Sequence, residues 1–95
     1  MPPQSDTPQL RVHVIEDDDD IREEAVFALG ELGFAATGFA DAPAFYRSFA
    51  VAPCDIAVVD IGLPGESGLS IVAHLRTAPS VGVVLVTARS ALEDR

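Results

Sequence analysis

The sequence contains no lysine, no tryptophan and only one cysteine, Cys54. A single cysteine excludes an internal disulfide framework and any zinc site built from several cysteines. All six cationic side chains are arginine, and fifteen aspartate and glutamate residues oppose them, so the net charge is −9. A chain this acidic lacks the basic patch that contacts with a nucleic-acid backbone require. We therefore expect no nucleic-acid binding by this chain.

Long hydrophobic runs are also absent. No apolar stretch approaches the ~18 residues of a membrane span. The first residues, MPPQSDTPQ, have neither the basic nor the apolar region of a signal peptide. Together these features predict a cytoplasmic chain without a membrane segment. The three prolines and the lack of periodicity within residues 1–9 predict a flexible leader.

Residues 10–95 are enough for one small domain, and they alternate between two kinds of segment. Short runs rich in β-branched residues predict strands, although the second run is weak because Gly38 interrupts it. The predicted strands are residues 12–15, 34–39, 56–59 and 81–86. Between them lie stretches with helical spacing. This alternation predicts an α/β fold with a doubly wound parallel sheet, in which the nearly continuous apolar runs are covered on both faces.

The spacing of apolar residues and the polar residues at segment ends support three helices. The first is predicted to bury one face, formed by Ile21, Ala25, Leu29 and Leu32. The third is predicted to bury Leu69, Val72 and Leu75. Helix-capping side chains precede all three: Asp18 or Asp19, then Asp41, then Ser67. Gly33 suits the end of the first helix.

Two strands end in acidic residues. Glu16 and Asp17 follow the first predicted strand, Asp60 ends the third, and Thr87 follows the fourth. Because binding sites of open α/β sheets form outside the carboxyl ends of the strands, these side chains should share one pocket. Carboxylates about 4 Å apart repel one another by about 4 kcal/mol per pair at an effective dielectric near 20. A hard divalent cation relieves that repulsion, and an all-oxygen pocket suits Mg²⁺.

The segments after these strands offer further polar groups. Pro64 and three glycines make residues 61–68 a tight loop that could aim a backbone carbonyl at the metal. The Thr87 hydroxyl and the backbone N–H of Ala88 could donate hydrogen bonds to a phosphoryl oxygen. A partly open acidic pocket with such donors is typical of phosphoryl chemistry.

Other chemically capable side chains have simpler interpretations. His13 and His74 have no second histidine or cysteine near them in the sequence, so we expect them to face solvent or to be hydrogen-bonded. We interpret Cys54 as a buried or loop thiol without a role. The aromatic residues of the second helix are expected to form part of the core and its rim.

The chain resembles the receiver domain of bacterial two-component response regulators. Three segments carry the resemblance, in the family's order and at its spacing: VHVIEDDDDIRE, VVDIGLPGESG and VLVTAR. The similarity covers residues 10–95. It implies a flavodoxin-like fold and a signalling domain rather than a classical enzyme, although such a domain can catalyse its own phosphorylation and dephosphorylation.

The resemblance also assigns the acidic residues. Asp60 would be the phosphoacceptor, which takes a phosphoryl group from a histidine kinase as an acyl phosphate. Asp17 would bind Mg²⁺ directly, Glu16 would act through a water molecule, and Gly62 would supply a main-chain carbonyl to the metal. Asp60 would complete the metal site.

A second set of positions would serve the phosphoryl group. Thr87 would be the switch hydroxyl that moves toward it, next to the Ala88 N–H. Gly62 and Arg89 occupy positions whose side chains tune dephosphorylation in the family, and Gly62 has no side chain to contribute.

The chain departs from the family pattern at its C-terminal end. The family fold has five strands, five helices and a lysine at the end of the fifth strand, whereas this chain ends at Arg95 and contains no lysine. The resemblance therefore implies a receiver truncated to about four strands, in the order 2-1-3-4. Strand 81–86 would then be an exposed apolar edge, through which we expect self-association.

Two other functions compete with phosphoryl acceptance. The chain could be a signalling-incompetent receiver fragment that acts only as an interaction or dimerisation unit. It could also be a phosphatase with an aspartate nucleophile. Such sites need a second aspartate two residues after the nucleophile, and here that position is Gly62.

Overall fold

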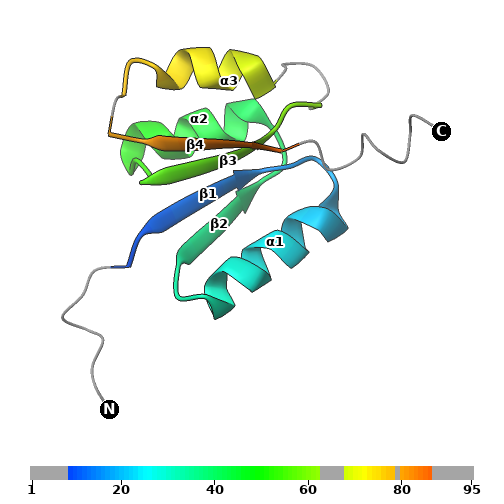
Figure 1. Ribbon diagram of the computed structural model, residues 1–95. Helices are drawn as coiled ribbons and strands as arrows, with labels where there is room; N and C mark the ends of the chain where they lie inside the picture. The colour runs from blue at the N-terminus through cyan, green and yellow to red at the C-terminus, as the bar shows by residue number, and fades with distance from the viewer. Residues whose placement is uncertain (1–8, 63–67, 79, 87–95) are drawn as a thin grey trace.

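A computed structural model of the protein describes residues 9–62, 68–78 and 80–86. Within these ranges strands and helices alternate along the chain (Figure 1). The strands are β1 (Arg11–Ile15), β2 (Ala35–Phe39), β3 (Ile56–Asp60) and β4 (Gly82–Val86). The helices are α1 (Asp19–Glu31), α2 (Ala42–Val51) and α3 (Gly68–Leu75). The predicted α/β alternation is confirmed.

The four strands form one parallel sheet in the order β2-β1-β3-β4. In the register of the two central strands, Val12 lies opposite Ile56 and Ile15 lies opposite Val59. The predicted strand order is therefore confirmed. Because all strands run the same way, their carboxyl ends lie along one edge of the sheet.

Two helices begin at the predicted capping residues. Asp18 caps α1, and its Oδ1 accepts a hydrogen bond from the backbone N–H of Ile21 at 3.0 Å. Asp41 caps α2 in the same way, with the N–H of Ala44 at 2.9 Å. Gly33 follows α1 with a φ of 100°, a left-handed conformation that suits glycine. The predicted cap Ser67 lies outside the described residues.

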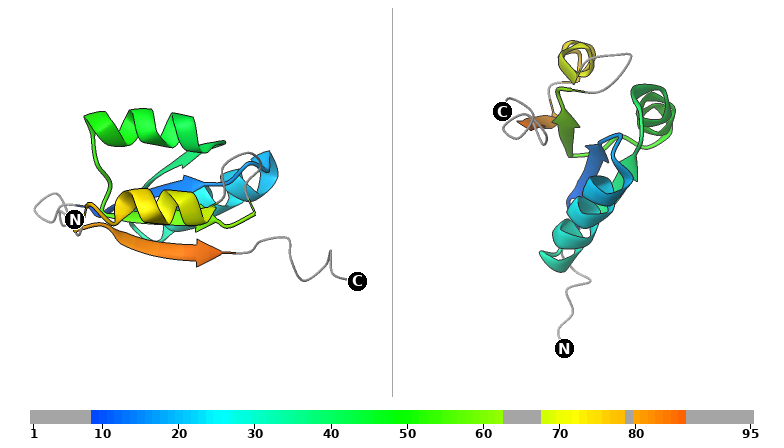
Figure 2. Two further views of the ribbon diagram at one scale, coloured as in Figure 1. Left: turned by 90° about the horizontal axis from the view of Figure 1, so that it is seen from above. Right: turned by 90° about the vertical axis from the view of Figure 1, so that its right-hand side faces the viewer.

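The main core lies between the sheet and helices α2 and α3, while α1 covers β1 and β2 from the opposite side (Figure 2). Its largest fully buried apolar side chains include Phe45 of α2, Ile71 of α3 and Ile15 of β1. Tyr46 and Phe49 of α2 pack around this cluster, as predicted. No residue of α1 is fully buried. Ile21, Ala25 and Leu29 are half-buried. Leu32 is 74% exposed, so its predicted place on the buried face of this helix was wrong.

Three other expectations were wrong in detail. Helix α3 buries Gly68, Ile71 and Leu75, whereas Leu69 is exposed, because a spacing of three drifts around a helix of 3.6 residues per turn. Gly38 does not interrupt β2 but pairs with Val14 inside it. His13 is buried, only 7% exposed, because its ring packs against Phe39 of β2 and Phe45 of α2.

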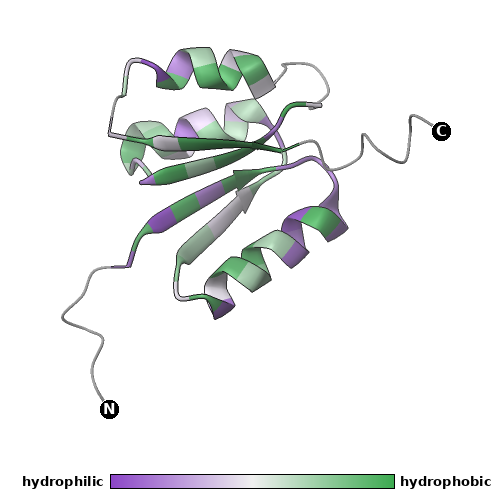
Figure 3. Ribbon diagram, viewed as in Figure 1, coloured by the Kyte–Doolittle hydropathy of each residue, from purple (hydrophilic) through white to green (hydrophobic). Residues whose placement is uncertain are grey.

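Strand β4 is hydrophobic over almost its whole length (Figure 3) and ends the sheet formed by the described residues. Its three central side chains, Val83, Val84 and Leu85, are 36%, 48% and 45% exposed. The expectation that this run is covered on both faces is therefore wrong, and the expectation of an exposed edge is confirmed for the described part of the chain. Within that part, no helix has the length and hydrophobicity of a membrane span.

Candidate metal centre

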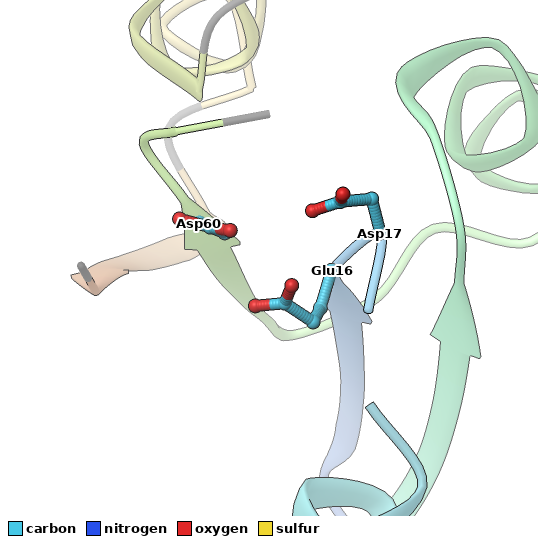
Figure 4. Close-up of side chains that lie close together, drawn as sticks. All are labelled: Glu16, Asp17 and Asp60. Carbon is cyan, nitrogen blue, oxygen red and sulfur yellow. The ribbon is translucent and has the colours of Figure 1, made fainter. Parts of the chain in front are cut away.

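Three carboxylates meet at the carboxyl edge of the sheet. Glu16 and Asp17 follow β1, and Asp60 ends the neighbouring strand β3 (Figure 4). One oxygen from each of these side chains lies within 4.8 Å of the other two. The convergence predicted from the strand ends is therefore present in the structure.

The backbone at the end of β1 holds Glu16 inside the pocket. Its N–H donates to the carbonyl of Phe39 at 3.0 Å, which extends the pairing with β2 by one residue. Its carboxylate accepts a hydrogen bond from the N–H of Asp18 at 3.0 Å. Glu16 is 2% exposed, whereas Asp17 is half-buried. Asp17 is therefore the more exposed carboxylate of the two.

Asp60 is fixed by its place at the end of a central strand. It is 1% exposed, and its Oδ1 accepts a hydrogen bond from the N–H of Gly62 at 2.9 Å. The next residue, Ile61, donates its N–H to the carbonyl of Val86 at 3.0 Å, which keeps the end of β3 paired with the end of β4. The Gly62 N–H thus holds the side chain, while pairing with β4 holds the strand end that carries it.

The pocket penalises negative charge when no cation is bound. At separations near 4.8 Å, two carboxylates repel by about 3–4 kcal/mol at an effective dielectric of 20. Burial raises the pKa of Glu16 above its ordinary value, and the charge of Asp60 raises it further. The hydrogen bond from the Asp18 N–H acts in the opposite direction on that pKa. The site therefore favours either a proton or a metal cation.

These residues fit Mg²⁺. They offer only hard oxygen donors, which Mg²⁺ and Ca²⁺ prefer, and no nitrogen or sulfur ligand belongs to the cluster. Mg²⁺ usually takes only one or two protein carboxylates and completes its shell with water and phosphate oxygens. Asp17 is the most exposed carboxylate of the three.

The structure brings together four of the predicted site residues: Glu16, Asp17, Asp60 and Gly62. Gly62 is exposed and adjoins the cluster through its hydrogen bond to Asp60. The predicted phosphoryl-binding and switch residues Thr87 and Ala88, and the position of Arg89, lie outside the described residues.

Sequence reasoning missed two residues that support the pocket. Arg22 of α1 donates from Nη1 to the carbonyl of Glu16 at 2.9 Å. Gly68, at the start of α3, lies directly against the main chain of Asp60. The position of Arg22 next to the acidic first turn of α1 only weakly indicated its contact with Glu16. No local signal could have predicted the second contact, because it depends on how α3 packs.

Comparison with known proteins relates this geometry to a family. The family model described as "Response regulator receiver domain" matches residues 12–95. Sensory transduction protein RegX3 of Mycobacterium tuberculosis is 38% identical over 84 residues, which cover 88% of this chain and 37% of that protein. Transcriptional regulatory protein CseB of Streptomyces coelicolor is 39% identical over 82 residues, which cover 86% of this chain and 35% of that protein. The chain thus spans little more than a third of these relatives.

Solved structures of similar fold include response regulator protein TrrA from Thermotoga maritima in complex with Mg(2+)-BeF. It has a TM-score of 0.78 and 27% identity, covering 90% of this chain and 79% of that one. A second structure, of histidine kinase ThkA in complex with TrrA, also gives a TM-score of 0.78 and 27% identity. The match covers 88% of this chain and 73% of that one. Chemotaxis protein CheY4 of Vibrio cholerae shares the fold, with a TM-score of 0.80 at 19% identity. The match covers 92% of this chain and 75% of that one.

Proposed function

Because the chain belongs to the response regulator receiver domain family, we propose that Asp60 accepts a phosphoryl group from a histidine kinase in the presence of Mg²⁺. A receiver domain is a signalling domain. The observation that carries the proposal is the meeting of three carboxylates, with oxygens within 4.8 Å of one another, at one sheet edge. The complex of TrrA with a histidine kinase supports the class of partner.

In the proposed step, a carboxylate oxygen of Asp60 attacks the phosphorus of a phosphohistidine. The new P–O bond replaces the P–N bond, and the electron pair of the broken bond stays on the imidazole nitrogen, which takes up a proton. The product is an acyl phosphate on Asp60. A bound Mg²⁺ would offset the charge of the phosphoryl oxygens.

Each pocket residue has a distinct part in this proposal. Asp17, half-buried at the pocket mouth, is a direct metal ligand, and the buried Glu16 acts through a water molecule. The N–H of Gly62 holds one oxygen of Asp60 at 2.9 Å, so that the carboxylate cannot rotate freely, and its carbonyl is the proposed main-chain ligand. These residues orient the nucleophile before the phosphoryl donor arrives.

A second group of residues, assigned from the sequence, would act on the phosphoryl group. The Thr87 hydroxyl and the Ala88 N–H would bind phosphoryl oxygens, and Thr87 would shift toward them on phosphorylation. Arg89 and Gly62 would set the rate of dephosphorylation. In this proposal the chain works in the cytoplasm, and it binds neither nucleic acid nor membrane.

Incubation with acetyl phosphate and Mg²⁺, followed by intact mass measurement, tests the proposal. We expect a mass increase of one phosphoryl group, absent with EDTA and absent in Asp60→Asn. Asp55→Asn is the matched control, because Asp55 lies at the opposite end of β3 and binds the N–H of Arg11. No adduct on the unaltered chain, or an adduct that persists in Asp60→Asn, would overturn it.

The exposed edge supports a second candidate role, as a self-association unit. Strand β4 contains no charged residue and no proline, and its central side chains are about 36–48% exposed. Two copies could pair these edges about a two-fold axis without bringing like charges together, despite the net charge of −9. Light scattering after size-exclusion chromatography should show a dimer that Val84→Lys dissociates. A monomer at high micromolar concentration would contradict this role.

The phosphatase alternative has no support in the site. Its second aspartate would occupy position 62, where Gly62 offers only main-chain groups. Turnover of an aryl phosphate by the chain would revive it.

A further inference from the structure

Arg22 of α1 ties its helix to the end of β1 beside the acidic pocket. Its Nη1 donates to the carbonyl oxygen of Glu16 at 2.9 Å, and its Nη2 binds the carboxylate of Asp19. The side chain is only 18% exposed although it carries a full charge. Helix α1 is thus fixed to the end of β1 at the point where Glu16 and Asp17 leave the sheet.

The neighbouring strand is built to admit this side chain. A Cβ on Gly38 of β2 would lie 2.8 Å from Cγ and 3.0 Å from Cδ of Arg22. Glycine inside a strand weakens the strand, because it raises the backbone entropy of the unfolded chain and has no side chain to pack. Here the missing side chain makes room for the stem of Arg22. Any other residue at position 38 must push that stem aside, and its Cβ would also lie 3.2 Å from Cγ2 of Val26.

We propose that Arg22 is a positioning residue of the metal pocket. The carbonyl that it binds belongs to the peptide group between Glu16 and Asp17. Fixing the plane of that peptide fixes the directions in which both carboxylates leave the backbone. This inference rests on the proposed function, because it assigns Arg22 to the same Mg²⁺ site.

The contact should matter most for metal affinity. Removing a group that orients metal ligands typically weakens binding about 10- to 100-fold. We therefore expect Arg22→Ala to weaken Mg²⁺ binding about 10-fold. Gly38→Ala should weaken it similarly, because it displaces the same side chain. Arg22→Lys should fall between, since lysine keeps a donor for the Glu16 carbonyl but not the planar fork that also reaches Asp19.

The test is an Mg²⁺ titration of the full 95-residue chain, followed by amide NMR, for each variant and for the double variant. If Gly38 acts by admitting Arg22, the two losses are not additive, and the double variant binds Mg²⁺ as Arg22→Ala does. Arg47→Ala is the charge control. Arg47 is exposed on α2, so removing it changes the net charge equally, and its Mg²⁺ affinity should stay within about two-fold of the unaltered chain.

Several outcomes would overturn the proposal. Unchanged Mg²⁺ affinity in Arg22→Ala, equal losses in Arg22→Ala and Arg47→Ala, or additive losses in the double variant would each do so. Thermal unfolding in EDTA identifies any variant that does not fold. If Arg22→Ala is one of them, Arg22→Lys and Gly38→Ala take its place.

A metal-free readout separates this proposal from the proposed function. Amide exchange at Asp17 and Asp18 should quicken in Arg22→Ala and not in Arg47→Ala, whether or not Mg²⁺ binds. If the unaltered chain binds no Mg²⁺, the proposed function fails, and equal exchange rates in these two variants would overturn the positioning role as well.

Discussion

Gly68 lies against the main chain of Asp60. A Cβ built on this glycine would be 2.7 Å from the carbonyl oxygen of Asp60 and 2.7 Å from the Cα of Ile61. Both contacts are with backbone atoms, which cannot swing away as the end of a side chain can. The start of α3 and the end of β3 can therefore approach this closely only because one residue lacks a side chain.

This contact predicts a large effect for a small substitution. Gly68→Ala should lower the free energy of unfolding by about 1–3 kcal/mol, since an added methyl group must displace packed backbone. Gly30→Ala in α1 is the control, because a Cβ there meets no atom within 4 Å. We expect it to stabilise by about 0.5–1 kcal/mol. Urea unfolding in EDTA measures both, and equal stabilisation of the two variants would contradict the packing argument.

The fold and the carboxylate cluster could be predicted from the sequence for one reason. Hydrophobic runs locate strands, and parallel strands deliver the residues that follow them to one edge. Glu16, Asp17 and Asp60 follow from this rule, whereas the strand order 2-1-3-4 follows only from the resemblance to receiver domains. The caps of α1 and α2 could also be predicted, because each depends only on neighbouring residues: the aspartate accepts a hydrogen bond from the N–H three residues later.

The supporting contacts could not be predicted, because they join segments that are distant in the sequence. Gly38 seemed to interrupt a strand, although it makes room for Arg22 of α1. Gly68 is expected from the sequence to serve the turn and packing, but the sequence does not say that it packs against the main chain of Asp60. His13 carries no mark of burial in the sequence, and only the packing of α2 against β1 encloses it.

Metal binding should stabilise the fold and should depend on Asp17. At a free Mg²⁺ concentration 100 times the Kd, the gain in unfolding free energy is about 2.7 kcal/mol, because the ion binds the folded chain preferentially. Asp17→Asn should lose this gain. Asp20→Asn, at an exposed position of α1, should retain it. Urea unfolding with and without Mg²⁺ measures the difference, and a full gain in Asp17→Asn would remove Asp17 from the metal site.

The metal-free protein should lose stability as the pH rises, through Glu16. Burial and then Asp60 raise the pKa of Glu16 above its ordinary value of 4.5. The folded chain therefore holds this proton more tightly than the unfolded chain does. The resulting stability is complete below about pH 4.5 and is lost as the pH rises through the raised pKa.

Glu16→Gln isolates this effect. Its amide oxygen can still accept the hydrogen bond from the Asp18 N–H, but it cannot ionise. In EDTA we expect the variant to be more stable than the unaltered chain at pH 8 and to lose less stability between about pH 5 and pH 8. The same decline in both proteins would show that Glu16 is not the responsible group.

His13 should give the opposite pH dependence. Its ring contacts Phe39 and Phe45 edge-on, with centroid distances of 5.0 and 5.9 Å, and its buried Nδ1 has no hydrogen-bond partner within the described part of the chain. Burial, followed by the positive charge of Arg11, lowers the pKa of His13 below its ordinary value of 6.5. The folded chain therefore resists protonation more than the unfolded chain does. This stability is complete above about pH 6.5 and is lost as the pH falls through the lowered pKa.

His13→Phe keeps an aromatic ring in the cluster and removes the titration. At pH 7.5 its unfolding free energy should stay within about 1.5 kcal/mol of the unaltered chain, as for other swaps of similar volume. Between about pH 7 and pH 5 it should lose less stability than the unaltered chain. His74→Phe, at an exposed position of α3, should lose as much stability over this pH range as the unaltered chain does. Urea unfolding across this range decides the matter, because an unchanged acid response in His13→Phe would mean that other groups cause it.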